Sequence, residues 1–167
     1  PAFNKLFIES EFVPELNLQI FKRRPRSNQE TGFFLGHMLV TRIGHAPAEH
    51  EADRNKFIGR GNNLRHPQEL NGGEHLSGTS GATFDTIFSL GREVKLEAHE
   101  SEDLAFLTLA ADSREELIGL ARRYQVWTAL QRTFRQSETA AQTWMSKQEI
   151  GTQEFKNILQ IFSALLY

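Results

Sequence analysis

The spacing of apolar side chains changes once along this chain, at Asp112. Before that point apolar residues alternate with polar ones or form short runs, as they do in β-strands. Beyond it they recur at three- and four-residue steps, the spacing of amphipathic α-helices. We therefore predict an α+β fold, with a mainly antiparallel β-sandwich over residues 1–111 and about three α-helices over residues 112–167.

Runs of β-branched and aromatic residues in the first part predict about six strands. They lie at Lys5–Val13, Leu16–Phe21, Phe33–Ile43, Ala82–Ile87, Phe88–Leu96 and Leu104–Ala111. We expect the second strand to be half-buried, because its apolar residues alternate with polar ones. The last is apolar on both sides, so we expect it at the centre of a sheet.

Two charged segments between these strands are predicted to be loops. Lys22–Arg26 is expected to be a solvated turn whose charges protect an edge strand, with a nucleic-acid patch as the alternative. Gly44–Asp53 is expected to be a polar loop; its His and acidic residues allow a divalent metal as a second interpretation, but their spacing matches no ligand pattern. Because the net charge is −2, no global field favours nucleic acid, and we predict neither that partner nor a metal site.

The helical part has recognisable starting signals. Ser113 and Glu116 form a capping box at the start of the first helix. The second helix carries apolar residues from Trp127 to Met145, and Thr152 is expected to cap the third. Because three amphipathic helices cannot bury their apolar faces alone, we expect them to lie on the sheet, on one another or on a domain outside this chain.

Composition limits the class of protein. Apolar residues make up 39% of the chain and include 13 Phe, which supports a packed core. There is no Cys, so disulfides and Cys-based metal sites are excluded, and no signal peptide or long apolar run is present. The chain starts at Pro1 and stops inside an apolar helical pattern, so we expect it to be a piece of a longer protein.

The segment Asp53–Leu90 combines cations, amides and glycines more densely than any other. Its multivalent hydrogen-bonding side chains are Arg54, Lys56, Arg60, Asn62, Asn63, Arg65 and Gln68. Such donors and acceptors hold neutral polyols, and Phe57 and His66 offer flat surfaces, so this segment is a candidate sugar-binding site. The alternative is a surface loop whose Arg side chains pair with Asp53, Glu69 or Asp85.

The same segment lacks the motifs of several other chemistries. It contains no Walker loop, no dinucleotide fingerprint and no nucleophile elbow. Gly78–Gly81 is either a small anion nest or a tight loop between strands. The acids Glu69, Glu74 and Asp85 show no pairing of the kind that glycoside hydrolysis needs. We predict no cofactor in this chain.

Three blocks, DRNKFIGRGNNLRHPQEL from Asp53, LSGTSGATFDTIFSLGREVKL from Leu76 and AADSREELIGLARRY from Ala110, resemble the sandwich domain of glycoside hydrolase family 94, formerly glycosyltransferase family 36. The resemblance covers nearly the whole chain in order. That family contains cellobiose and chitobiose phosphorylases and the phosphorylase-like region of bacterial cyclic β-1,2-glucan synthases. The opening KLFIESEFVPEL with KRRPRS is most similar to the glucan synthases.

The resemblance implies a galactose-mutarotase-like supersandwich, of which residues 1–111 are the C-terminal part, with residues 112–167 as a helical linker. It implies an (α/α)6 barrel outside this chain that carries the general acid and binds inorganic phosphate. The whole enzyme is then a hexosyltransferase or phosphorylase acting on β-glucan oligosaccharides, on the cytoplasmic side and anchored in the bacterial inner membrane through other domains.

Within this chain the resemblance implies no catalytic residue. It implies a substrate-binding role for Asp53, Arg54, Phe57, Arg60, Asn63, Ser77 and Thr79. It also implies contact with the barrel and a homodimer. Two rival functions remain open: a stand-alone carbohydrate-binding module, and a purely structural dimerisation domain.

Overall fold

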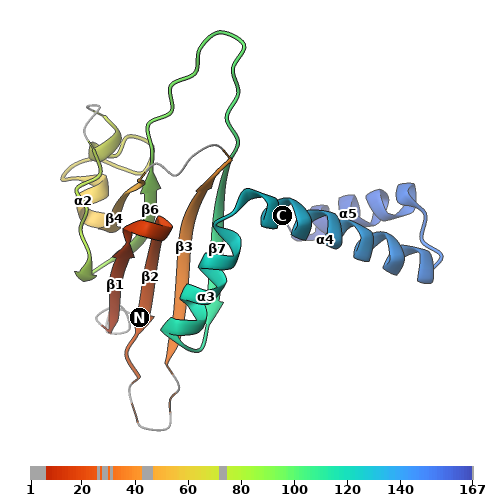
Figure 1. Ribbon diagram of the computed structural model, residues 1–167, viewed down its shortest axis with the longest axis horizontal. Coiled ribbons are helices and arrows are strands. Elements are labelled where there is room, and N and C mark those ends of the chain that lie inside the picture. The colour runs from red at the N-terminus through yellow and green to blue at the C-terminus, as the bar shows by residue number, and fades with distance from the viewer. Residues whose placement is uncertain are drawn as a thin grey trace. The chain divides into compact units, whose positions relative to one another are not determined.

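The computed structural model describes residues 7–25, 27, 30, 32–42, 47–71 and 75–166. It forms two compact units, Pro1–Trp127 and Thr128–Tyr167, which are described separately. The predicted ends of the first and third strands at Lys5 and Ile43, and the start of the predicted loop at Gly44–Ala46, lie outside the described residues. The strands belong to the first unit (Figure 1).

The larger sheet has five antiparallel strands in the order β5-β1-β2-β3-β7. Their bounds are Ile8–Val13 for β1, Leu18–Arg23 for β2, Phe33–Thr41 for β3, Gly81–Ala82 for β5 and Leu104–Ala111 for β7. A short 3-10 turn, η1 at Pro14–Leu16, connects β1 to β2. The positions predicted for the strands before Pro14, from Phe33 and from Leu104 are thereby confirmed, whereas the strand predicted at Leu16–Phe21 lies two residues later, at Leu18–Arg23.

A second, two-stranded antiparallel sheet packs against one face of the first. It consists of β4, Glu49–Asp53, and β6, Thr86–Gly91. The Gln19 side chain of β2 joins the two layers: it donates to the Glu51 carbonyl at 3.0 Å and accepts from the Ser89 N–H at 3.2 Å. Two facing sheets with side chains interlocked between them make a β-sandwich, so the predicted fold class is confirmed.

The opposite face of the larger sheet is covered by α3, Arg114–Tyr124. Leu117 of α3 is fully buried above Gly36 of β3. A Cβ atom on Gly36 would lie 3.1 Å from Leu18 and 3.2 Å from Leu117, so the glycine permits the close approach of helix and sheet. Because both faces are covered, residues Leu18–Phe21 of β2 are all buried, and the half-buried strand that alternation predicted is wrong.

Ser113 begins α3 as predicted, because its hydroxyl oxygen accepts a hydrogen bond from the Glu116 N–H at 3.1 Å. Replacement of Ser113 by alanine is expected to lower the free energy of unfolding by about 1 kcal/mol, because one helical N–H loses its acceptor. Urea denaturation followed by circular dichroism measures this loss. The matched variant Ser101→Ala, in an exposed loop, should leave the midpoint unchanged; equal midpoints for both variants would contradict the role of the cap.

The predicted position of β7 at the centre of a sheet is wrong. It is an edge strand, paired with β3 alone among the described strands, and its side chains are alternately exposed and half-buried. The residues under α3 are the half-buried ones. The apolar residues on the other side, Leu104 and Phe106, are exposed, which is why the sequence resembles that of a central strand.

Two segments were assigned to the wrong class by their polarity. The predicted polar loop ending at Asp53 contains strand β4, and the predicted charged turn begins inside β2, which continues through Arg23. Conversely, the strands predicted at Ala82–Ile87 and Phe88–Leu96 are wrong in their bounds: one strand, β6, runs from Thr86 to Gly91, and only the two-residue β5 precedes it. Residues 92–103 form the long connection drawn in green beyond β6 (Figure 1). Arg92 and Glu102, near its two ends, form an ion pair of 3.2 Å.

The second unit consists of most of α4, Trp127–Lys147, and of α5, Thr152–Leu166. The three predicted helices are present. The third begins differently from the prediction: Gly151, not Thr152, is the cap, because the Glu154 carboxylate accepts from the Gly151 N–H at 2.7 Å and Phe155 N–H donates to the Gly151 carbonyl. The predicted division of the chain at residues 111 and 112 falls between β7 and α3 and stays a prediction.

Candidate functional site

The site is built where β4 ends and the short helix α2, Arg54–Ile58, begins. The Asp53 carboxylate caps this helix by accepting from the Asn55 N–H at 2.9 Å. Gly59 ends it with φ of +77° and ψ of 163°, a backbone conformation that is essentially restricted to glycine. The cap and the glycine together define the two ends of α2, and thereby the positions of Arg54 and Asn55 in its first turn.

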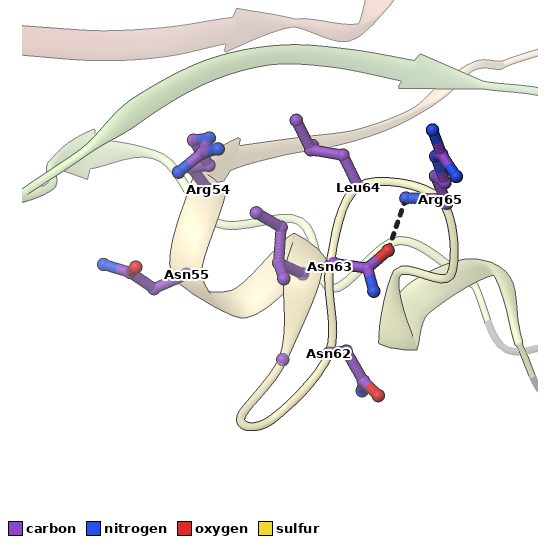
Figure 2. A pocket seen from close by; sticks show the side chains of 8 residues that line it. Arg54, Asn55, Asn62, Asn63, Leu64 and Arg65 are labelled. Atoms are coloured by element: carbon purple, nitrogen blue, oxygen red, sulfur yellow. Dashed lines mark hydrogen bonds between the residues drawn. The ribbon is translucent and has the colours of Figure 1, made fainter.

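An open cavity of about 820 Å³ lies between α2 and the turn that follows it (Figure 2). It is lined by Arg54, Asn55, Ile58, Gly59, Asn62, Asn63, Leu64 and Arg65. Three amides and two guanidinium groups therefore surround a space that also contacts two aliphatic side chains. Its volume falls in the range of small-ligand sites, and its groups can donate to and accept from hydroxyls.

Two of these side chains are held by neighbours within the domain. Arg54 Nη1 lies 3.4 Å from the carboxylate of Asp85, just before β6. This is one of the ion pairs that the surface-loop interpretation predicted, but a guanidinium carries five N–H donors and the contact uses one of them. The Asn63 side-chain oxygen accepts from the Arg65 N–H at 2.9 Å, a contact that does not use the two N–H donors of the Asn63 side chain (Figure 2).

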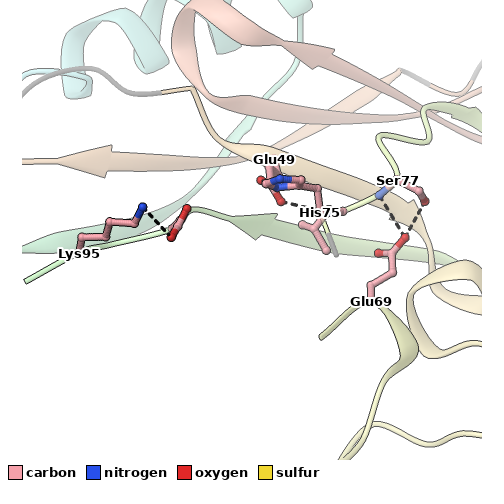
Figure 3. A network of polar contacts seen from close by, with 7 residues as sticks. Glu49, Glu69, His75, Ser77 and Lys95 are labelled. Carbon is pink, nitrogen blue, oxygen red and sulfur yellow. Dashed lines mark hydrogen bonds and ion pairs between the residues drawn. The ribbon is translucent and has the colours of Figure 1, made fainter. Parts of the chain in front are cut away.

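A loop beside the cavity, residues 75–81, is fixed by Glu49, Glu51 and Glu69. Figure 3 shows Glu49 and Glu69 beside this loop. The Leu76 N–H donates to Glu49 at 3.0 Å, and the Ser77 N–H donates to Glu69 at 3.1 Å. The Ser77 hydroxyl contacts Glu69 at 2.6 Å and also contacts Glu51. The 3-10 turn η2, Gln68–Leu70, brings Glu69 to this position.

Three further backbone donors of this loop also have acceptors within the protein. Gly78 N–H donates to the His50 carbonyl at 2.9 Å, Thr79 N–H to the Glu51 carboxylate at 3.4 Å, and Gly81 N–H to the Ser10 hydroxyl at 3.0 Å. The anion nest considered at Gly78–Gly81 is not supported, because three of its four backbone N–H groups already donate within the protein. The segment is a tight loop, as the alternative predicted.

Glu51 is the buried centre of this arrangement. Burial by itself would raise the pKa of its carboxyl, but hydrogen bonds from the Ser77 hydroxyl, the Asp53 N–H at 2.6 Å and Thr79 outweigh it and hold the pKa below the ordinary value of 4.5. A carboxyl whose pKa is lowered by folding stabilises the fold above its ordinary pKa. That stabilisation is lost as the pH falls through the lowered pKa.

We expect Glu51→Gln to lower the free energy of unfolding by about 1–3 kcal/mol at pH 7, because an ionised acceptor of several donors is replaced by a neutral one. Below pH 4.5 the difference between the two proteins should shrink, because the carboxyl of the unfolded chain is then protonated, and it should vanish once the pH falls through the lowered pKa of the native carboxyl. Urea denaturation between pH 3 and 7 measures both effects. Glu93→Gln, at an exposed position, is the control; parallel pH profiles for Glu51→Gln and the unmodified protein would contradict this role.

Two comparisons with known proteins show the family of this chain. Residues 1–126 match the model of the glycosyl hydrolase 94 supersandwich domain. The chain belongs to this family. It is also 32% identical over 128 residues to the cyclic beta-(1,2)-glucan synthase NdvB of Rhizobium meliloti strain 1021, a match that covers 75% of this chain and 4% of that protein.

The seven substrate-binding residues implied by the resemblance do not all line the cavity of this glycosyl hydrolase 94 domain. Arg54 and Asn63 line it. Asp53 shapes it indirectly as the cap of α2. Phe57 is half-buried on α2 and Arg60 is exposed in the following turn; neither belongs to the lining.

Ser77 and Thr79 lie on the neighbouring loop, and their hydroxyls have protein partners. Ser77 contacts two glutamates, and the Thr79 hydroxyl accepts from Lys56 Nζ at 2.9 Å. The structure thus gives these two residues a part in holding the loop against β4 and α2. A direct contact of either with substrate stays a prediction.

Sequence reasoning missed Asn55 and the two aliphatic residues Ile58 and Leu64 as lining residues. A signal for Asn55 was available in the sequence. Asn55 follows Arg54 directly in the first turn of a helix that Asp53 caps, so both side chains leave the helix near its N-terminal end. Among the residues that the structure describes, no group of three or more His, Asp or Glu is placed to hold a metal ion. No helix in the described ranges is both long and apolar enough to cross a bilayer.

Proposed function

We propose that this chain is the sandwich and linker part of a larger enzyme that makes or phosphorolyses β-linked glucans, and that it binds the glucan without performing the chemistry. The observation that carries the proposal is the family match together with the similarity to a cyclic β-1,2-glucan synthase. Since the chain spans about 4% of that relative's length, a catalytic barrel has room elsewhere in the larger protein, which we call the parent.

The cavity at α2 is the proposed glucan-binding site. Its amides and guanidinium groups suit the hydroxyls of a sugar chain, and its aliphatic side chains suit the apolar face of a pyranose ring. Binding there would position the glucan for reaction at the barrel. No cofactor is required for this role, and inorganic phosphate would act only at the barrel of the parent.

The second unit is proposed to serve as a scaffold for the barrel. The apolar residues of α5 lie on one helical face and are exposed: Ile158, Leu159, Ile161, Phe162, Leu165 and Leu166. On α4, Phe134 and Trp144 are exposed as well. Apolar surface of this extent marks a contact with another protein surface, and a neighbouring domain of the parent is the partner that the family match supports.

Titration of linear and cyclic β-1,2-glucan into the 167-residue chain tests the binding role. We expect NMR shift changes confined to residues 54–65, and we expect Asn62→Ala and Arg65→Gln to weaken binding about ten-fold, a loss of about 1.4 kcal/mol. Asn71→Ala and Arg122→Gln are the matched controls, since neither residue lines the cavity. Absence of binding, or binding that none of the variants weakens, would exclude this site.

An activity assay tests the non-catalytic role. The chain, mixed with β-glucan and inorganic phosphate, should release no glucose 1-phosphate. Measurable release by the pure chain would overturn the proposal that catalysis belongs to another domain. Sedimentation of the same sample separates a glucan-binding module from a structural dimer: a dimer that fails to bind either glucan would favour the structural function.

A further inference from the structure

The polar groups that line the cavity at α2 are mostly hydrogen-bond donors. They are two guanidinium groups and three amides, and no carboxylate belongs to the lining. A guanidinium only donates, whereas an amide both donates and accepts. One amide oxygen is already in use, because Asn63 Oδ1 accepts from the Arg65 N–H at 2.9 Å. A ligand that only accepts hydrogen bonds would use this lining more fully than one whose hydroxyls must also donate.

The segment that forms the cavity is also cationic. In a chain whose net charge is −2, residues 54–65 contain no Asp or Glu but four cations: Arg54, Lys56, Arg60 and Arg65. The neighbouring acids are directed into the fold. Glu51 is 0% exposed, Glu69 is 8% exposed, and both accept hydrogen bonds from the loop at residues 75–81. Because these carboxylates are occupied elsewhere, the positive field at the cavity is only partly balanced.

Of the two cations in the lining, Arg65 has the less neutralised charge. Arg54 Nη1 lies 3.4 Å from the carboxylate of Asp85, which offsets part of the Arg54 charge. Among the residues that the structure describes, none forms an ion pair with Arg65. In Figure 2 the two guanidinium groups lie on either side of Leu64, which is 59% exposed. The cavity thus presents an apolar side chain flanked by cations.

We infer that this cavity binds a glucosyl unit that carries a phosphate group, with the sugar ring over Leu64 and the phosphate on the Arg65 guanidinium. A phosphate monoester bears nearly two negative charges at neutral pH and has three strong acceptor oxygens. A guanidinium matches two of these oxygens with parallel N–H···O bonds, which are about twice as strong as hydrogen bonds between neutral groups. The inference rests on the proposed glucan-binding function and specifies the charge of its ligand.

The phosphate belongs either to a free sugar phosphate or to an ester on a glucan chain, since Arg65 would make the same contact with both. This contact is distinct from the phosphate site that the resemblance places in the barrel, because the cavity is lined entirely by residues 54–65 of the sandwich. The 167-residue chain can therefore be tested by itself.

Calorimetric titration of two ligand pairs measures the preference for phosphate. One pair is glucose and glucose 6-phosphate, and the other is a β-1,2-linked glucobiose and its 6-phosphate ester. In both pairs we expect the phosphate-bearing ligand to bind about ten-fold or more tightly at low salt. The gain should shrink at about 0.5 M salt, where exposed charges are screened. The pair with the larger gain distinguishes the two sources of the phosphate.

Arg65→Gln and Arg60→Gln form a matched pair, because both remove one exposed cation from the same segment and only Arg65 lines the cavity. Arg65→Gln should reduce the preference for the phosphate-bearing ligand to about two-fold or less, while Arg60→Gln should keep most of it. Equal losses in both variants would show that the general positive field, and not a contact with Arg65, attracts the ligand, contrary to the inference.

Three further outcomes separate this inference from the proposed function. Equal affinity for neutral and phosphate-bearing ligands would overturn the inference and leave the glucan-binding role intact. Inorganic phosphate or glucuronic acid that binds as tightly as glucose 6-phosphate would also overturn it, since the site would then recognise any anion. If none of the four sugars binds, both the inference and the proposed function fail.

Discussion

Replacement of Leu117 by alanine is expected to lower the free energy of unfolding by about 2–5 kcal/mol. Leu117 is fully buried at the centre of the contact between α3 and the larger sheet, where it meets Gly36 and lies close to Leu18. Truncation removes apolar contact and leaves a cavity that neither neighbour can fill, because Gly36 has no side chain to move. Urea denaturation, monitored by circular dichroism, measures the loss.

Leu96→Ala is the control for this substitution. Leu96 is 55% exposed in the long connection after β6, so the same chemical change removes little buried surface, and the unfolding midpoint should hardly move. A loss below about 1 kcal/mol for Leu117→Ala would show that α3 is not packed on the sheet as described, since that is less than a buried leucine contributes. Gly36→Val should also destabilise, through overpacking at the same contact.

Gly59→Ala is expected to have the second largest effect, a loss of about 1–3 kcal/mol from backbone conformation alone. Its φ of +77° is unfavourable for alanine, and a Cβ atom there would lie 2.5 Å from Cβ of Gln68, so η2 must also move. Because Gly59 lines the cavity and η2 carries Glu69, both the candidate site and the neighbouring loop should change. Thermal unfolding together with the glucan titration measures the two consequences.

Gly61→Ala separates the two causes. Gly61 also has positive φ, +81°, but no atom lies within 4 Å of the position that its Cβ would take. It should therefore show a backbone cost without the collision with Gln68, and the difference between the two variants reports the collision. If Gly61→Ala were as damaging as Gly59→Ala, the packing of α2 against η2 would be less close than the structure indicates.

The elements that sequence predicted well are those whose signals are local. Ser113 and Glu116 placed the start of α3 to the residue, since a capping box needs only four neighbouring residues. The strand from Phe33 was predicted from its β-branched and aromatic content. The change in the spacing of apolar residues at Asp112 gave the correct fold class. This spacing reflects which side chains of a strand or a helix face the core, so it distinguishes the two kinds of element.

The elements that sequence missed depend on partners far away in the chain. Strand β4 looks like a polar loop, but Glu49 and Glu51 find their donors about 26 residues away, in the loop at Leu76–Thr79. β7 looks like a central strand, because its apolar outer face has no cover within the residues described. In both cases the polarity of a side chain depends on the groups that surround it in the fold. The local sequence does not show which groups those are.

The candidate site was predicted in part for the same reason. Arg54 and Asn63 were recognised by type, since amides and cations in a short segment suit a sugar. Ser77 and Thr79 have equally suitable chemistry, but their hydroxyls are engaged by Glu51, Glu69 and Lys56, which no spacing in the sequence reveals. Residue type identified the segment that contains the site. Only the tertiary contacts distinguished the residues that line the cavity from those, such as Ser77 and Thr79, that hold the neighbouring loop.

The ion pair between Arg92 and Glu102 has a practical consequence. Both side chains are mostly buried, and they bring the two ends of a twelve-residue excursion together at the rim of the sandwich. The tip of this connection is a tight turn in which the Glu100 N–H donates to the Glu97 carbonyl. Because the ion pair holds the two ends together, a change at the tip should not be transmitted to the two sheets. A fluorophore or an affinity tag inserted at that tip should leave both sheets undisturbed, which makes it a convenient handle for following this domain inside its enzyme.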